Sequence, residues 1–246
     1  MRIQSATYNI VYPECRNIRR EVFTLEDKLD SLFVKPFSLI PIPDDAPAEL
    51  PRIQATSNVG NSLLSISLNS AQLNIEYNNI EYNNNDFLED IRKCMYKVFD
   101  AISNSTNNKY LFSGLTLNIV VDDLNTNPVD VLLNNFGQSN NNIKPFDITN
   151  KVAYVYNDQY YINIECSNFR KYRSPSSISI NPFANAEEVA HLMLVTLDIN
   201  DRYAFNYKDG YLSSSDEVEN IINLTSSILS TKIERYIKEG VFELWY

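Results

Sequence analysis

The sequence predicts an α+β protein of two similar units, each an antiparallel sheet with helices packed on one face. Short runs alternate between apolar and polar residues, which is typical of strands that are buried on one side only. Longer segments carry apolar residues at helical spacing. The order strand, helix, strand meander, helix occurs once before and once after about residue 105, so we divide the chain into an N-terminal unit at 1–104 and a C-terminal unit at 105–246.

The N-terminal unit begins with a predicted strand and a predicted helix. The run IQSATYNIVY alternates and places Ala6, Tyr8 and Ile10 on one face. A helix is expected near 22–34, with Thr24 as its N-cap ahead of leucine and phenylalanine residues at helical spacing. The proline-rich stretch KPFSLIPIPDDAPAELP excludes a regular helix and a central strand, so we expect an extended connection there.

Three further alternating runs, RIQATS, SLLSISL and AQLNIEY, predict a meander of antiparallel strands with one solvent-exposed face. The pentapeptide IEYNN occurs twice in succession at 75–84. We expect the first copy to continue the third strand and the second to belong to a surface loop, because asparagine tolerates turn conformations. The next helix is expected to be capped by Asp86, with an apolar stripe from Phe87 to Ile102.

The C-terminal unit repeats this order. The run KYLFSGLTLNIVV predicts a strand, and PVDVLLNNF predicts a helix whose first turn holds Pro128. A hairpin that turns at 157–158 and the long strand VAHLMLVTLDIN follow, and RYAFNY is expected to be a further short strand. The clearest element is one continuous helix from 214 to 239, capped by Ser214, ended by Gly240 and striped with isoleucine.

Composition limits the partners and the location of the chain. The formal net charge of −10 opposes indiscriminate binding to nucleic acid or to anionic lipid. No apolar run approaches the roughly 18–20 residues of a membrane span, and the start of the chain resembles no signal peptide. We therefore expect a cytoplasmic location without a membrane partner. Cys15, Cys94 and Cys166 are odd in number and far apart, which favours reduced thiols.

The chain lacks the sequence patterns of common catalytic sites. Its five glycines form neither a nucleotide-binding loop nor a nucleophile elbow, so we expect no cofactor. His191 is the only histidine, which excludes a zinc site with two histidines, and we interpret it as structural. One alternative is a divalent metal site: Glu165 and Asp198 lie on the polar sides of their strands and would meet if the strands are neighbours. A solvated sheet face explains the same pattern.

Two short basic clusters could bind nucleic acid. NFRKYRSPSS combines arginine and lysine with aromatic residues, a mixture that can grip phosphates and stack bases, and CRNIRR adds a second cluster. In an acidic chain, solvated loop charges or a docking site for an acidic protein explain them better, so nucleic acid is possible but not favoured.

The strand YYINIECSN and the basic segment after it predict a binding surface. An antiparallel sheet with helices on one face leaves its other face available, and tyrosine is enriched where proteins meet. We expect a partner-binding surface centred on Tyr161 and extending to Arg170 and Arg173. Its residues are Tyr161, Asn163, Glu165, Arg170, Lys171, Tyr172 and Arg173. Alternatively, Tyr161 packs under a helix of the other unit and belongs to the core.

The succession of LPRIQATSNVGNSLLSISLNSAQLNIEY, FLEDIRKCMYKVFDAI, YLFSGLTLNIVV and VTLDINDRYAF before a terminal helix resembles a sporadically distributed bacterial family of about this length without assigned function. The resemblance implies a bacterial origin and an intracellular accessory role in a defence or mobile-element context, and it carries no site residues. We therefore expect a non-enzymatic cytoplasmic accessory protein that acts through a protein partner or through self-association. The alternative is a metal-dependent nuclease or a nucleic-acid-binding protein.

Overall fold

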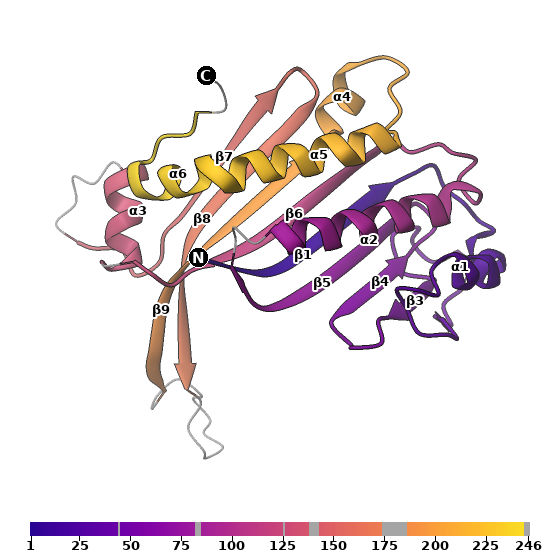
Figure 1. Ribbon diagram of the computed structural model, residues 1–246, viewed down its shortest axis with the longest axis horizontal. Helices are drawn as coiled ribbons and strands as arrows, with labels where there is room; N and C mark the ends of the chain where they lie inside the picture. The colour runs from indigo at the N-terminus through magenta and orange to yellow at the C-terminus, as the bar shows by residue number, and fades with distance from the viewer. Residues whose placement is uncertain (44, 82–84, 125, 138–142, 174–185, 244–246) are drawn as a thin grey trace.

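The computed structural model contains one antiparallel sheet of nine strands and several helices, which confirms the α+β class (Figure 1). It describes the whole chain except residues 44, 82–84, 125, 138–142, 174–185 and 244–246. The strands are β1 (Arg2–Val11), β2 (Ser38–Leu39), β3 (Ile53–Thr56), β4 (Ser62–Ile66), β5 (Ser70–Glu81), β6 (Phe112–Val121), β7 (Thr149–Tyr156), β8 (Tyr160–Arg173) and β9 (Glu187–Asn200).

The strand order is β2-β3-β4-β5-β1-β6-β9-β8-β7. In each half of the chain, the first strand pairs with the last strand of the meander that follows it, β1 with β5 and β6 with β9. Because β1 also pairs with β6, both halves share one sheet. Two similar units, each with its own sheet, are therefore not confirmed.

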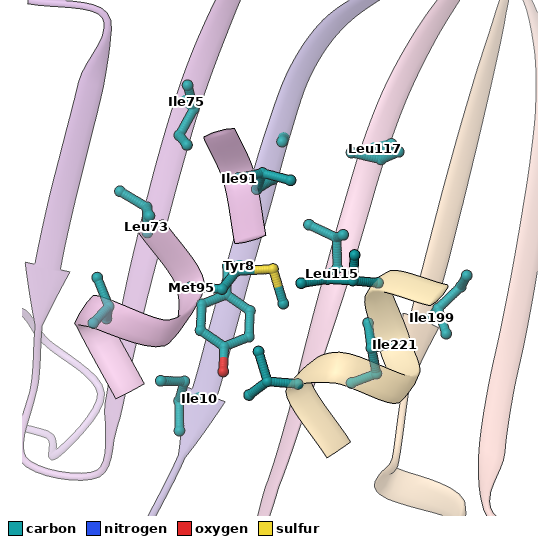
Figure 2. Close-up of a cluster of buried hydrophobic side chains, with 14 of the residues drawn as sticks. Tyr8, Ile10, Leu73, Ile75, Ile91, Met95, Leu115, Leu117, Ile199 and Ile221 are labelled. Carbon is teal, nitrogen blue, oxygen red and sulfur yellow. The ribbon is translucent and has the colours of Figure 1, made fainter. Parts of the chain in front are cut away.

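Long helices cover one face of this sheet. The helices are α1 (Val22–Lys28), α2 (Asn85–Ser103), α3 (Pro128–Phe136), α4 (Arg202–Tyr207), α5 (Ser215–Ser227) and α6 (Ile233–Glu239), with a 3₁₀ turn at Ile18–Glu21 and a π-helical segment at Ile228–Lys232. In Figure 1, α2, α5 and α6 cross the same side of the strands. Figure 2 shows Ile91 and Met95 of α2 and Ile221 of α5 packed with Tyr8 and Leu115 of the sheet.

The core follows from the alternation along the strands. On β1 from Ala6, on β6 from Leu115 and on β9 from Met193 onward, every second residue is buried under the helices, and the residues between them are only partly covered. Each fully buried isoleucine or leucine stabilises the fold by about 1.5–3 kcal/mol relative to an exposed one, so this one-sided pattern fixes which face the helices cover. The meander β3–β4–β5, the Pro128 helix start and the turn at Asn157–Asp158, where both residues have positive φ, are confirmed.

The predicted terminal helix is an unbroken helical path from Ser215 to Glu239 that includes the π-helical segment. Its isoleucine stripe, including Ile222 and Ile233, is fully buried. Gly240 ends it in the left-handed region, as expected. Ser214 occupies the N-cap position, but its side chain makes no capping hydrogen bond.

Three local predictions are wrong. The first helix ends at Lys28, and Thr24 lies inside it, because a 3₁₀ turn that precedes Val22 starts the helix without a threonine cap. α2 begins at Asn85, so Asp86 lies in its first turn. The segment RYAFNY is the helix α4 rather than a strand.

The repeated IEYNN pentapeptide also differs from the expectation. β5 continues to Glu81, so the strand includes the start of the second copy, whose residues 82–84 lie outside the described part of the chain. Ile3 pairs with Ile80 and Ser5 pairs with Glu76, so three residues of β5 lie opposite the single residue Gln4 of β1. The first copy therefore supplies a bulge in the sheet, and the two copies are not equivalent.

Candidate functional site

The side of the sheet opposite α2 and α5, here called the open face, carries polar side chains on its central strands. A ladder of hydrogen bonds connects them across the strands. The Thr7 hydroxyl donates to the side-chain oxygen of Asn74 at 2.8 Å, and the Asn118 amide donates to Ser5 Oγ at 3.0 Å. The Thr196 hydroxyl donates to Asn118 Oδ1 at 2.9 Å. These bonds fix the side chains, so the open face is an ordered polar surface.

Asp198 lies within this ladder and accepts three hydrogen bonds from neutral groups. Its carboxylate receives the Thr116 hydroxyl at 3.0 Å and the side-chain amides of Asn163 at 2.8 Å and Asn200 at 2.9 Å. All of these donors come from β6, β8 and β9. The carboxylate is thus held by amide and hydroxyl groups, as a structural acceptor on a sheet face would be.

Glu165 lies on the same face, one position further along the ladder. β8 and β9 are neighbours, as the metal hypothesis required; Glu165 lies opposite Thr196, and Asp198 lies opposite Asn163. Glu165 forms an ion pair with Lys151 of β7 at 3.6 Å. Within the described residues, no group of three histidine, cysteine or acidic side chains could hold a metal ion. The two carboxylates therefore share a face, and each is engaged by other side chains.

α4 covers one end of the open face with aromatic residues. The ring of Tyr161 meets Tyr203 edge-on, with centroids 5.3 Å apart, and Tyr203 lies 4.6 Å from Tyr207. The ring of Phe112 lies 5.5 Å from Phe205. We call these five residues the aromatic patch. Tyr207 is 68% exposed and Phe205 is 36% exposed, so the patch presents aromatic surface to solvent.

A cation and a hydrogen bond add to the patch. The guanidinium of Arg202 lies 5.4 Å from the ring centroid of Phe112. A hydrogen bond to Tyr161 raises the pKa of the Tyr207 hydroxyl. Tyr161 is partly exposed, so it lies neither on a bare surface nor in the core. Its partial cover comes from α4 of its own half of the chain, which differs from both predicted environments.

A buried carboxylate holds α4 in place. Asp201 is fully buried, and it accepts hydrogen bonds from the Ser113 backbone N–H at 2.6 Å and from the Tyr211 hydroxyl at 2.7 Å. Burial raises the pKa of this carboxyl, and hydrogen bonds from Ser213, Ser113 and Tyr211 oppose the rise. Because Asp201 and Tyr211 flank α4, their hydrogen bond closes the base of the loop that displays the patch.

The basic segment lies at the other end of β8. There β8 and β9 extend beyond the other strands as a two-stranded arm (Figure 1). Arg170 forms an ion pair with Glu188 at 2.7 Å and stacks on the Phe146 ring at 4.1 Å, and Arg173 pairs with Glu187 at 3.4 Å. These acidic partners on β9 balance both arginines. Lys171 and Tyr172, also on the arm, are exposed.

The predicted surface is therefore divided between two ends of one strand. Tyr161 and Arg170 are nine residues apart on β8, a separation of about 30 Å at about 3.3 Å per residue. Beside the arm, a groove of about 460 Å³ contributes apolar surface. Its lining includes Val120, Phe169, Lys171 and Leu192.

The second basic cluster, CRNIRR, lines a cavity of about 770 Å³ next to the proline-rich connection. Arg16 pairs with Glu14 at 2.8 Å, and Arg19 donates to the carbonyls of Ile40 at 3.0 Å and Ile42 at 2.6 Å. Arg16 and Arg19 thus bind the chain itself, and Arg19 holds the proline-rich connection.

His191 and the cysteines occupy structural positions. The His191 ring lies 3.4 Å from the Asn168 amide. The pKa of His191 is lowered, mainly because the ring is partly buried and secondly because the positive charge of Arg170 is near. The three cysteines are free thiols, and Cys166 is fully buried.

The aromatic residues of α4 were missed by the sequence analysis. Tyr203, Phe205 and Tyr207 alternate with smaller or polar residues, which is typical of a strand. Residues four apart lie on one side of a helix and also on one face of a strand, so the spacing of Tyr203 and Tyr207 gives no signal that distinguishes the two.

Comparison with family models and with curated proteins gives no relative from which a role could be transferred. No family model matches the chain, and no curated protein matches it. Among the helices of the described part of the chain, none has the length and apolar character needed to cross a membrane.

Proposed function

We propose that this chain is a non-enzymatic binding or accessory protein that engages a protein partner through the open face of its sheet. The observation that carries the proposal is the aromatic patch, which gathers three tyrosines and two phenylalanines beside Arg202. Tyrosine and arginine are enriched at the centres of protein interfaces because they combine large contact area with polar tips. The ordered polar ladder next to the patch supplies directional hydrogen-bonding groups.

A protein partner fits the charges of this face better than a nucleic acid does. The chain carries a net charge of −10, and Asp198 and Glu165 lie on the face itself. The arginines of the arm that favoured phosphate binding are balanced by Glu187 and Glu188. A polyanion would therefore meet little uncompensated positive charge here.

The biological setting of the proposal depends on the family resemblance alone. On that basis we assign the chain an accessory role in the bacterial cytoplasm, in a defence or mobile-element context. Gene neighbourhood tests this setting directly, because an accessory protein is expected to be encoded beside the system that it serves.

The test compares partners captured by matched variants in the native cell. The wild-type chain, Tyr207→Ala and the control Phe23→Ala are each purified with their associated proteins, which are measured by quantitative mass spectrometry. Phe23 is 74% exposed on α1, so the control removes a similar ring outside the patch. We expect one partner to be lost from Tyr207→Ala alone, with unchanged melting temperatures. Equal capture by all three proteins contradicts the proposal.

The nuclease alternative has its own test. The purified chain is titrated with Mg²⁺ and Mn²⁺ by calorimetry and then incubated with single-stranded and double-stranded DNA and RNA. We expect neither saturable metal binding nor cleavage. Cleavage that is abolished by Glu165→Gln or Asp198→Asn would replace the proposed function with a metal-dependent nuclease.

A further inference from the structure

The two edges of the sheet differ in how well they are protected. An unpaired edge strand exposes N–H and C=O groups that can pair with another chain, and proteins blunt such edges with short strands, prolines and charged side chains, lysine above all. β2 is only two residues long, with Pro36 before it and Pro41 after it. β7, at the opposite edge, spans eight residues and contains neither proline nor glycine. β7 therefore has the features of a strand that takes a partner.

The ladder shows which groups of β7 point outward. The Asn168 N–H donates to the Ile148 carbonyl at 3.3 Å, so this pair is hydrogen-bonded. Hydrogen-bonded and non-hydrogen-bonded pairs alternate along an antiparallel ladder, so the even-numbered residues of β7 bond to β8. The odd-numbered residues direct their N–H and C=O groups away from the sheet. These residues are Thr149, Lys151, Ala153 and Val155, and their side chains are exposed.

The described part of the chain supplies no hydrogen bond to these outward groups. We propose that they pair with β7 of a second copy of this chain, antiparallel and about a twofold axis at Val152. In this register, Thr149 lies opposite Val155 of the second copy, and Lys151 lies opposite Ala153 of the second copy. Every outward residue then meets an outward residue, so each free N–H and C=O finds a partner.

Charge and symmetry also favour a second copy as the occupant. Lys151 is the only charged residue of β7, and it is paired with Glu165 of its own chain. The register places no lysine directly opposite another lysine, which avoids a destabilising like-charge pair. A twofold axis perpendicular to the sheet keeps both open faces on one side. The dimer would then present two aromatic patches on the same side. Their joint use in binding a partner rests on the proposed function, whereas the dimer itself does not.

The first experiment measures the mass of the protein in solution by sedimentation equilibrium. We expect twice the 28.3 kDa of the single chain. Ala153→Pro removes an outward N–H and leaves the bonds from β7 to β8 intact, so it should give the single-chain mass with an unchanged circular dichroism spectrum. The matched control Ala153→Val keeps the N–H and should remain dimeric. A wild-type chain that is monomeric at every concentration overturns the proposal.

The second experiment tests the register and does not depend on the folding of the proline variant. Val152 would lie opposite itself in a non-hydrogen-bonded pair, where Cα atoms are about 4.5 Å apart, within the range of a disulfide. Under mild oxidation, Val152→Cys should form a covalent dimer, and Ala153→Cys should form none above the wild-type background. Equal cross-linking of both variants, or of neither, overturns the proposal.

Discussion

Replacement of Asp201 with alanine is expected to destabilise the protein and to release α4 from the end of the open face. Asp201 is fully buried, and its carboxylate joins the start of β6, through the Ser113 N–H at 2.6 Å, to the loop after α4, through the Tyr211 hydroxyl at 2.7 Å. The substitution leaves these donors without their acceptor. None of the side chains of the aromatic patch is changed, so any loss of partner binding reports on the position of α4.

The hydrogen bonds from Ser113 and Tyr211 set the magnitude of the expected loss of stability. A hydrogen bond to a charged group contributes about 1.5–3 kcal/mol, so their loss costs about 3–6 kcal/mol. Part of this cost is offset because burial disfavours the charged carboxylate, as its raised pKa indicates. We therefore expect a net loss of about 2–4 kcal/mol. For a chain of this length, that loss lowers the melting temperature by about 5–15 °C.

Urea unfolding followed by circular dichroism measures this loss, and a double-mutant cycle assigns it. Tyr211→Phe removes only one of the donors to this carboxylate and should cost about 1–2 kcal/mol. Because the Asp201 and Tyr211 side chains are in contact, the double variant should lose less than the sum of the single variants, with a coupling of about 0.5–3 kcal/mol. An unchanged stability in Asp201→Ala, or a strictly additive cycle, refutes the assigned role of the carboxylate.

The remaining predictions concern packing and pH. Ile222→Asp and Ile233→Asp each place a charge in the core and should cost about 3–5 kcal/mol in thermal melts; an unchanged melting temperature would contradict the assigned buried face. Gly114→Ala places a Cβ 2.7 Å from the Cβ of Asn200 and should lower the free energy of unfolding in urea by about 1–3 kcal/mol. An unchanged free energy of unfolding would show that β6 and β9 move apart at this position without cost. The pKa of Asp201 is raised above its ordinary value of 3.8 in the folded protein, so folding favours the protonated carboxyl; the stability linked to this protonation is complete below that pH and falls as the pH rises through the folded-state pKa. The stability of the wild-type chain relative to Asp201→Asn should fall accordingly from acid to neutral pH, and a constant difference would exclude this linkage.

The strands and their buried faces could be predicted because the signal is local. Alternation along β1 identifies Tyr8 and Ile10 as core residues without knowledge of any other strand, and both are buried. The merging of the two halves into one sheet has no such signal. It depends on pairs such as Ala6 with Leu117, which are far apart in the sequence and have ordinary strand residues on both sides.

The candidate site was predicted only in part, for the same reason. The placement of Tyr161, Asn163 and Glu165 on one side of β8 is confirmed, because it follows from the alternation of a single strand. The contribution of α4 was missed, because the helix is held by the buried Asp201, a tertiary interaction that overrides the strand-like alternation of its rings. The acidic partners of Arg170 and Arg173 lie 18 and 14 positions away, and only the pairing of β8 with β9 brings them together.

The open face and the aromatic patch would have different roles in binding. A protein partner must offset the entropy lost when side chains are ordered at an interface, about 0.5–1.5 kcal/mol for each mobile one. Asn118 and Asp198 are already held by cross-strand hydrogen bonds, so little of that cost remains on the ladder. When exposed polar groups bind a partner, they exchange hydrogen bonds to water for hydrogen bonds to the partner, with little net gain in free energy. They therefore orient the partner more than they increase its affinity. The rings of the patch have apolar surface to bury, so we expect them to supply most of the affinity. If the proposed function holds, the anchoring of α4 by Asp201 would then set how strongly the whole face can bind.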